Sequence, residues 1–173
     1  MKDAVKTHYT RPELGKKIRQ ALEKAGKNPK QLHLRDLAPV DQLHTGGAPA
    51  TLELMQHAGL DKGMIILDAG CGIGGTSRLL AQNFNLVVHG IDLSKDFIET
   101  ASMLNQWCGF AKDGTINLKQ GSLLALPYPD HFFDAVLCQH VLLNIKDKPK
   151  AFAEFSRVLA PQGKLILHEI VDG

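Results

Sequence analysis

MIILDAGCGIGG, residues 64–75, sets the architecture expected of the chain. Its first four residues form a short continuous apolar run, which is typical of a parallel strand buried on both faces. Four glycines follow between positions 70 and 75. They allow a tight turn that a ligand can approach closely, because no Cβ is in the way. With a helix expected through about Ala81, this region predicts one strand–turn–helix unit of an α/β protein.

Further strands and helices are predicted to alternate toward the C-terminus. Strands are expected at residues 86–91, 116–119, 135–138 and 164–170, and helices from a cap at Ser94 to Cys108 and from about Lys148 to Val158. Strands that alternate with helices imply right-handed crossovers and a parallel sheet with helices on both faces. The predicted fold is an α/β, Rossmann-like three-layer αβα sandwich over residues 61–173.

The first sixty residues are predicted to form a helical segment that packs on this core and covers its site. Thr10 and Glu13 have the spacing of a capping box. Apolar residues then recur at every fourth position from Leu14 to Leu22, before a glycine that can end the helix. A second helix is expected at residues 49–57, after a glycine-bearing loop.

Composition and charge narrow the functional classes. The chain has 173 residues, of which 44% are hydrophobic and 22% charged, the mix of one globular domain. A net charge of +2, with no basic stripe, argues against nucleic acid as a partner. No apolar run reaches the roughly 18 residues of a membrane span, and no signal peptide is apparent. Three cysteines without CxxC spacing indicate neither a metal site nor a disulfide framework, so a cytoplasmic protein is predicted.

The glycine turn by itself fits two cofactors. Gly70, Gly72 and Gly75 match the GxGxxG pattern of dinucleotide-binding proteins, and Asp92 lies 22 residues after Gly70, near the spacing of about 20 for a ribose-binding acid. An NAD-dependent oxidoreductase is therefore one interpretation. Against it, Asp68 stands at the mouth of the turn. A carboxylate there would repel a pyrophosphate and attract the cationic amino group of a methionine moiety.

Four motifs in order resemble those of class I S-adenosylmethionine-dependent methyltransferases. They are LDAGCGIG at 67–74, GIDLS at 90–94, GSLLALPYPD at 121–130 with FDAV at 133–136, and RVLAPQGKL at 157–165. Residues 37–47 and 139–145 more narrowly resemble the small-molecule subgroup that includes the sarcosine and dimethylglycine methyltransferases. The resemblance implies S-adenosyl-L-methionine (SAM) as cofactor, a small-molecule methyl acceptor such as an amine, and a sheet of order 3-2-1-4-5.

The resemblance also implies which residues hold the methionine end of the cofactor. Asp68 would lie near the amino group, and Gln139 would flank the same end of the molecule. The turn would pack against the methionine and ribose portion through Gly70, Cys71, Gly72 and Gly74.

The remaining expected cofactor contacts follow the second and third strands. Asp92 would hold the ribose, and Leu93 would lie against the adenine. Ser122 and Leu123 would meet the adenine edge. Many members of the family carry an aspartate where this chain has Ser122, and a hydroxyl would make a weaker contact. For Leu93 and Leu123, plain core packing is the alternative interpretation.

Two histidines are candidates for the chemistry. Methyl transfer depends mainly on alignment, and a general base is needed only if the acceptor carries a proton when it attacks. His140 and His44 lie by loops expected near the methyl group and would act as base or orient the acceptor, unless each is a structural, hydrogen-bonded histidine. Tyr9 is a further candidate for covering the site.

The resemblance implies seven strands, whereas the sequence stops where strand five is expected to end. A truncated chain without strands 6 and 7 is therefore predicted, with the edge of strand five exposed. Because an open edge invites pairing with another chain, a homodimer joined at strand five is expected. The shortened core also leaves a third interpretation, a non-catalytic SAM-binding module.

Overall fold

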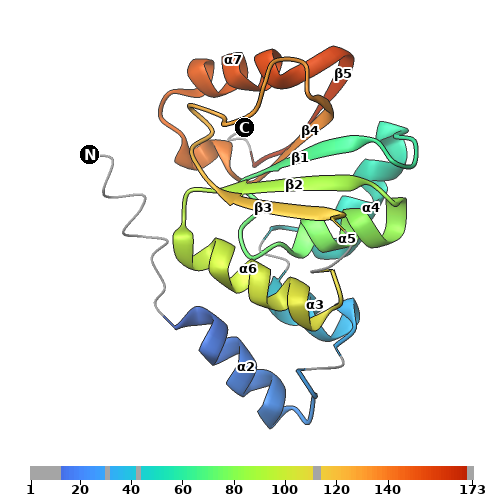
Figure 1. Ribbon diagram of the computed structural model, residues 1–173, viewed down its shortest axis with the longest axis vertical. Helices are drawn as coiled ribbons and strands as arrows, with labels where there is room; N and C mark the ends of the chain where they lie inside the picture. The colour runs from blue at the N-terminus through green and yellow to red at the C-terminus, as the bar shows by residue number, and fades with distance from the viewer. Residues whose placement is uncertain (1–12, 30–31, 42–43, 111–113, 171–173) are drawn as a thin grey trace.

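The computed structural model describes residues 13–29, 32–41, 44–110 and 114–170, which place a parallel sheet between helices (Figure 1). The sheet over these residues consists of β1 Ile65–Ala69, β2 Val87–Asp92, β3 Ile116–Gln120, β4 Phe133–Gln139 and β5 Leu159–His168. All four pairings are parallel, and the strand order is β3-β2-β1-β4-β5. The predicted fold class and strand order are confirmed.

Helices cover both faces of the sheet. They are α2 Leu14–Lys24, α3 Leu34–Asp41, α4 Gly47–Ala58, α5 Gly75–Phe84, α6 Lys95–Trp107 and α7 Lys148–Val158. Helix α7 lies on one face, whereas α4, α5 and α6 lie on the other, and α2 and α3 pack outside α5 and α6 (Figure 1). The N-terminal helices are therefore an addition to the side of the sandwich that carries α5 and α6.

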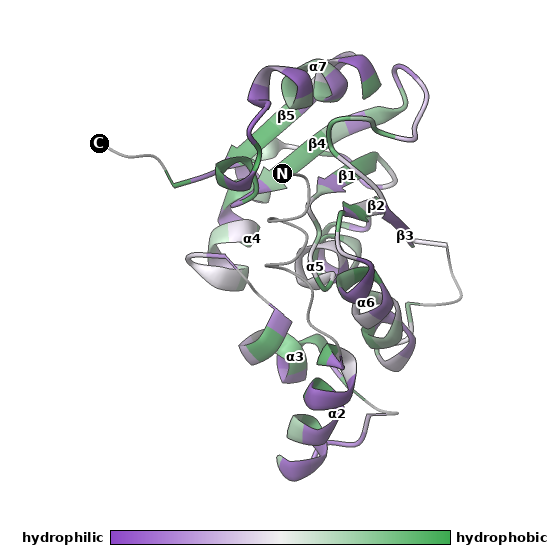
Figure 2. Ribbon diagram, turned by 90° about the vertical axis from the view of Figure 1, so that its left-hand side faces the viewer, coloured by the Kyte–Doolittle hydropathy of each residue, from purple (hydrophilic) through white to green (hydrophobic). Residues whose placement is uncertain are grey.

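The central strands are buried because they carry apolar side chains on both faces. In β1, Leu67 faces a core cluster with Phe155 of α7, and Ile66 faces a cluster with Met55 of α4 and Leu80 of α5. Figure 2 shows the resulting hydrophobic colouring along β4 and β5. Burial of each such side chain contributes about 1.5–3 kcal/mol. A third cluster, between α2, α3 and α6, attaches the N-terminal helices.

Several predicted boundaries shift. Helix α2 begins at Leu14, and its N-cap is Glu13, in a left-handed conformation (φ 65°) and with no side-chain cap hydrogen bond. Glu13 therefore does not occupy the third helical position that a capping box requires, and that prediction is wrong; Thr10 lies outside the described residues. The cap at Ser94 is confirmed, because its hydroxyl oxygen accepts from the Phe97 amide at 3.3 Å.

The last two strands also differ from the prediction. Strand β4 begins at Phe133, two residues early, and β5 runs from Leu159 to His168 rather than over 164–170. The pairing register shifts between Phe133 and Ala135, so an irregularity accommodates the turn-like residues 161–163 within β5. Helix α3 was not located from the sequence, since Pro39 lies inside it and reads as a breaker.

Candidate functional site

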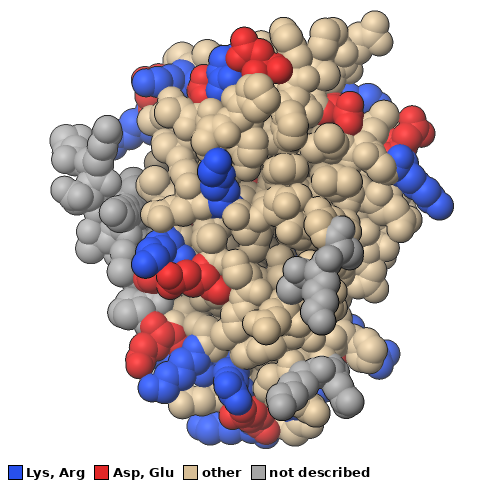
Figure 3. All heavy atoms as spheres, viewed as in Figure 1, with Lys and Arg blue, Asp and Glu red and all other residues tan. Residues whose placement is uncertain are grey.

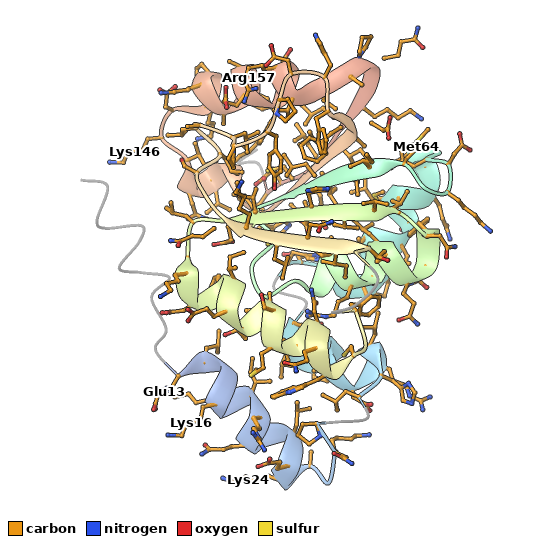
Figure 4. All side chains as sticks on the ribbon, viewed as in Figure 1. Glu13, Lys16, Lys24, Met64, Lys146 and Arg157 are labelled. Atoms are coloured by element: carbon orange, nitrogen blue, oxygen red, sulfur yellow. The ribbon has the colours of Figure 1, made fainter. Side chains whose placement is uncertain are left out.

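A cavity of about 670 Å³ lies at the edge where the strands end, and its volume falls in the range of roughly 300–1,000 Å³ typical of small-molecule sites. Lys146 marks this edge in Figure 4, opposite Met64, which precedes β1. Eleven of the twelve predicted site residues line it: His44, Asp68, Gly70, Cys71, Gly72, Asp92, Leu93, Ser122, Leu123, Gln139 and His140. Open α/β sheets bind ligands at such an edge.

The glycine turn after β1 forms the floor of this cavity. The amides of Gly70 and Cys71 both donate to the Ile91 carbonyl, at 2.8 and 3.0 Å, which fixes the turn to the end of β2. Gly70 has φ 83°, and a Cβ there would overlap the side chain of Val141. The turn can therefore exist only with a glycine at this position.

Gly74 is the one predicted site residue that does not line the cavity. It is the N-cap of α5, with φ 79°, and a Cβ on it would crowd Arg78 and Ala101. The close approach of α5 and α6 therefore gives Gly74 a packing role, and its cofactor contact stays a prediction. Gly75, which completes the GxGxxG pattern, is likewise explained by packing: a Cβ there would overlap the backbone carbonyl of Asp41 in α3.

Asp92 ends β2 with its carboxylate held in one orientation. Oδ2 accepts from the Gly72 amide at 3.0 Å, and Oδ1 accepts from the Ser94 amide at 2.8 Å. Burial raises its pKa, although these backbone donors oppose the rise. Each oxygen can accept a further hydrogen bond, because a carboxylate offers about four lone-pair sites. The side chain is thus suited to accept from a pair of hydroxyl groups in the cavity.

Asp68 is a second carboxylate in the wall, and it is almost fully buried. Burial raises its pKa to about 6, the nearby Asp92 adds to the rise, and the Ser77 hydroxyl, which donates to Oδ2 at 2.6 Å, opposes it. At neutral pH the group is therefore ionised at a cost in folding free energy. Two carboxylates beside one cavity, one buried and one partly buried, favour a ligand that carries a positive charge.

The segment after β3 closes the opposite side of the cavity. The Ser122 hydroxyl oxygen accepts from the Leu124 amide at 3.2 Å, which leaves its proton for another partner. Leu123 belongs to a core cluster and also lines the cavity, so its core packing is confirmed and its contact with adenine stays a prediction. Leu93 is 42% exposed and faces the cavity, so the plain-core interpretation of that residue is wrong.

Helix α7 clamps this segment through residues that the sequence did not single out. Arg157, labelled on α7 in Figure 4, donates to the carbonyls of Leu126 and Tyr128 at 3.0 and 2.9 Å. Glu154 accepts from the Leu126 amide at 2.6 Å, and its pair with Arg157 lowers its pKa. The loop that carries Ser122 is therefore fixed by a charged pair on α7, which packs in the same core cluster as Leu123 and Leu126.

The other end of the cavity holds a polar cluster built from distant segments. The Gln139 amide Nε2 donates to the Thr51 hydroxyl and to His168 Nδ1, both at 3.2 Å. The hydroxyls of Thr51 and Thr76 lie 3.3 Å from Gln139 Oε1, and Thr51 Oγ1 also lies 3.1 Å from His44 Nε2. His168, Thr51 and Thr76 were not among the predicted site residues, and of the three only Thr76 lines the cavity.

Parallel pairing explains how these residues meet. In the register of β4 and β5, Gln139 lies opposite His168, and the His140 amide donates to the His168 carbonyl at 2.9 Å. Thr51 comes from α4, which Lys164 of β5 secures by donating to the carbonyls of Ala58 and Gly59. The signal that could have revealed His168 is its place at the end of the strand next to β4.

Three imidazoles therefore gather at this end. The ring centroids of His140 and His168 are 4.9 Å apart. The ring centroid of His44 lies 6.0 Å from that of His140 and 5.9 Å from that of His168. Burial lowers the pKa of His44, and the neighbouring imidazoles add to this effect. Over the described residues, no cluster of three or more His, Cys, Asp and Glu side chains has a geometry that could hold a metal ion.

The two predicted histidines differ in their partners. His44 is engaged at both nitrogens, Nδ1 with the Thr45 carbonyl at 3.3 Å and Nε2 with Thr51. The His140 side chain makes ring contacts but no hydrogen bond with the described part of the chain, and its backbone is left-handed (φ 55°). Tyr9 lies outside the described residues.

Within those residues, no helix has the length and apolar character to cross a membrane.

Comparisons with known proteins agree with this geometry. Residues 67–167 match the family model described as a methyltransferase domain. Phosphoethanolamine N-methyltransferase 1 of Zea mays is 34% identical over 125 residues, which is 72% of this chain and 24% of that protein. The chain thus spans about a quarter of the length of such curated relatives.

Solved structures of methyltransferases are also similar to this chain in their three-dimensional fold. Phosphoethanolamine N-methyltransferase 2 of Haemonchus contortus, in complex with S-adenosyl-L-methionine, is 26% identical with a TM-score of 0.72 and covers 95% of this chain and 35% of its own. A protein of Galdieria sulphuraria assigned as a sarcosine/dimethylglycine methyltransferase shares the fold, with 23% identity, a TM-score of 0.66 and coverage of 86% and 57%. From its matched motifs and its fold, the chain belongs to the methyltransferase domain family.

Proposed function

We propose that this chain is the cofactor-binding core of a SAM-dependent methyltransferase that transfers a methyl group to a small-molecule acceptor, an amine. The observation that carries the proposal is a pair of carboxylates in the wall of the cavity beside the glycine turn, the buried Asp68 and the partly buried Asp92. The family match supports it, and so do the relatives, whose names specify N-methylation.

The residues present fit SAM from one end to the other. Asp92 has both oxygens oriented by backbone amides and would accept from the two ribose hydroxyls. Asp68, ionised at neutral pH, would attract the cationic amino group. Leu93 and Ser122 would contact the adenine, and the open backbone at Gly70 would admit the methionine portion. The carboxylate wall is a poor partner for a pyrophosphate, which favours SAM over NAD and a transferase over an oxidoreductase.

The histidine end of the cavity is the proposed acceptor site. When bound, SAM supplies an electrophilic methyl group, so this chain has only to bind the reactants, align them and exclude water from them. An amine acceptor can attack only through a free lone pair, and a neutral imidazole can take the proton that blocks it. Among the candidates, His140 has its ring nitrogens available, whereas Thr51 and the Thr45 carbonyl engage His44. We therefore assign the base to His140 and the orienting role to His44.

The acceptor is a small molecule rather than a nucleic acid. On the face shown in Figure 3, acidic and basic side chains are interspersed without a continuous basic stripe. A surface of this kind lacks the electrostatic footprint of nucleic-acid binding. The relatives' names point to phosphoethanolamine as the first acceptor to try.

The experiment that tests the proposal measures methyl transfer from SAM carrying a labelled methyl group to phosphoethanolamine, sarcosine and dimethylglycine. The expected result is a methylated amine and one equivalent of S-adenosylhomocysteine. SAM binding without transfer to any amine would instead support the non-catalytic module. Hydride transfer with NAD would support the oxidoreductase.

We also propose a homodimer formed through β5. This strand pairs with β4 on one side only, within the described residues, and it exposes Leu165 and Leu167. An open edge with apolar neighbours is suited to pair with a second copy. Light scattering at micromolar concentration should give twice the mass of 18.9 kDa, and Leu167→Lys should halve it. A monomeric wild-type chain would contradict this assignment.

A further inference from the structure

A buried ion pair joins the N-terminal helices to the turn that forms the floor of the cavity. The Arg78 side chain on α5 is fully buried, and its Nη2 donates to Asp41 Oδ2 and to the Ile73 carbonyl, both at 2.9 Å. Nη1 donates to Asn105 Oδ1 of α6 at 2.9 Å. One guanidinium therefore holds α3, the glycine turn and α6 together.

The backbone geometry shows how close this junction is. Asp41 is the last residue of α3, and its carbonyl lies where a Cβ on Gly75 would have to be. Asp41 and Ile73 both line the cavity. The end of α3 and the turn are thus in direct contact at the wall of the cavity.

Stability alone is a weak reason for such a pair. Taking two charges out of water costs several kcal/mol per ion, and well-packed apolar residues often replace a buried pair without loss. In addition, Arg78 Nε is buried without a hydrogen-bond partner in the described part of the chain, so the guanidinium is incompletely satisfied. What the pair adds is a defined position of α3 relative to the turn.

We propose that Asp41 is a positioning residue for the cofactor. Through Arg78 it sets the Ile73 carbonyl and the glycine turn in their binding geometry, and it couples the order of α3 to occupancy of the cavity. This inference rests on the proposed function, because it takes the cavity to be the SAM site.

The test distinguishes the position of the carboxylate on α3 from the negative charge that it supplies to Arg78. Asp41→Asn leaves Arg78 without its carboxylate and is expected to lower both the melting temperature and the affinity for SAM. The double variant Asp41→Asn, Asn105→Asp moves the carboxylate to α6, where Asn105 already contacts Arg78. It should recover the melting temperature but still bind SAM roughly tenfold more weakly in calorimetry, within the 5–150-fold range of coupled sites.

Each result decides a different point. Equal SAM affinity in the double variant and the wild type would overturn this inference, since charge neutralisation alone would then suffice. A wild-type chain that does not bind SAM would overturn the proposed function instead. An unchanged Asp41→Asn variant would also count against the positioning role.

A measurement on the unmodified chain covers the case in which the variants do not fold. Hydrogen–deuterium exchange of the wild type, with and without SAM, should show added protection over residues 34–41 as well as over residues 70–75. Protection confined to residues 70–75 would overturn the coupling between α3 and the cavity.

Discussion

The two ends of the cavity are built in different ways. The proposed cofactor end uses backbone turns and two carboxylates from the C-terminal ends of β1 and β2, as in the Asp92 contacts with Gly72 and Ser94. The acceptor end joins side chains far apart in sequence, as in the contact between Thr51 and Gln139. Local backbone geometry suits a constant ligand, whereas a side-chain cluster can change its residues without disturbing the fold. Cofactor choice and acceptor choice should therefore respond to different substitutions.

The largest effect is expected from Asp92→Ala, a substitution at the proposed cofactor end of the cavity. It would remove the proposed charge-assisted hydrogen bonds to two ribose hydroxyls, of about 1.5–3 kcal/mol each, so SAM affinity should fall roughly a thousandfold in calorimetry. Glu99→Ala, on the exposed surface of α6, is the matched control and should bind as the wild type does. Retained affinity in Asp92→Ala would place the ribose elsewhere.

The reverse pattern is expected at the acceptor end. His140→Ala should lower kcat about a hundredfold, the lower limit of what a general base contributes, and leave the Kd for SAM unchanged. His33→Ala, which removes an exposed histidine, is the control. A His140→Ala variant that keeps the wild-type kcat would show that another group removes the proton.

Asp68→Asn should separate binding from stability. The native pKa of about 6 lies above the ordinary value of 3.8, so the ionised group opposes folding at pH 7, and this opposition fades as the pH falls from 6 toward 3.8. The difference corresponds to about 3 kcal/mol, an upper limit for the gain in stability at pH 7.

SAM affinity should nevertheless fall in Asp68→Asn, by about tenfold. In the wild type the affinity should weaken below pH 6 as Asp68 is protonated, and in the variant this dependence should vanish. Calorimetry across pH 5 to 8, paired with thermal unfolding, measures both effects. A variant that is less stable and binds SAM equally well would contradict the assigned role.

The smallest effect is expected from Thr51→Val, which keeps the shape of the side chain and removes the hydroxyl shared by His44 and Gln139. Stability should fall by about 1 kcal/mol, and the KM for the acceptor should rise a few-fold. The KM for SAM should stay the same. An increase in the KM for SAM alone would assign this cluster to the cofactor end.

The same contrast explains how much the sequence could predict. The strand–turn–helix unit and the Ser94 cap follow from local patterns. The family resemblance implied the strand order, which is confirmed, and the site residues, of which eleven of the twelve line one cavity. Gly74 is not among the residues that line the cavity, and a motif alone cannot distinguish a glycine needed for helix packing from one that contacts a ligand.

The residues that were missed depend on tertiary structure. His168 reaches the site only through the register of β4 and β5, and Arg157 only because α7 packs over the loop after β3. Arg78 is buried only because α3 brings Asp41 against it. No spacing in the sequence encodes these contacts, because their partners lie 27 to 37 residues away.

The most direct test of the central claim is calorimetric titration of the wild-type chain with SAM and, separately, with NAD. A cavity walled by Asp68 and Asp92 should bind one SAM per chain and show no heat of binding with NAD. Saturable binding of NAD, with no response to SAM, would contradict the account.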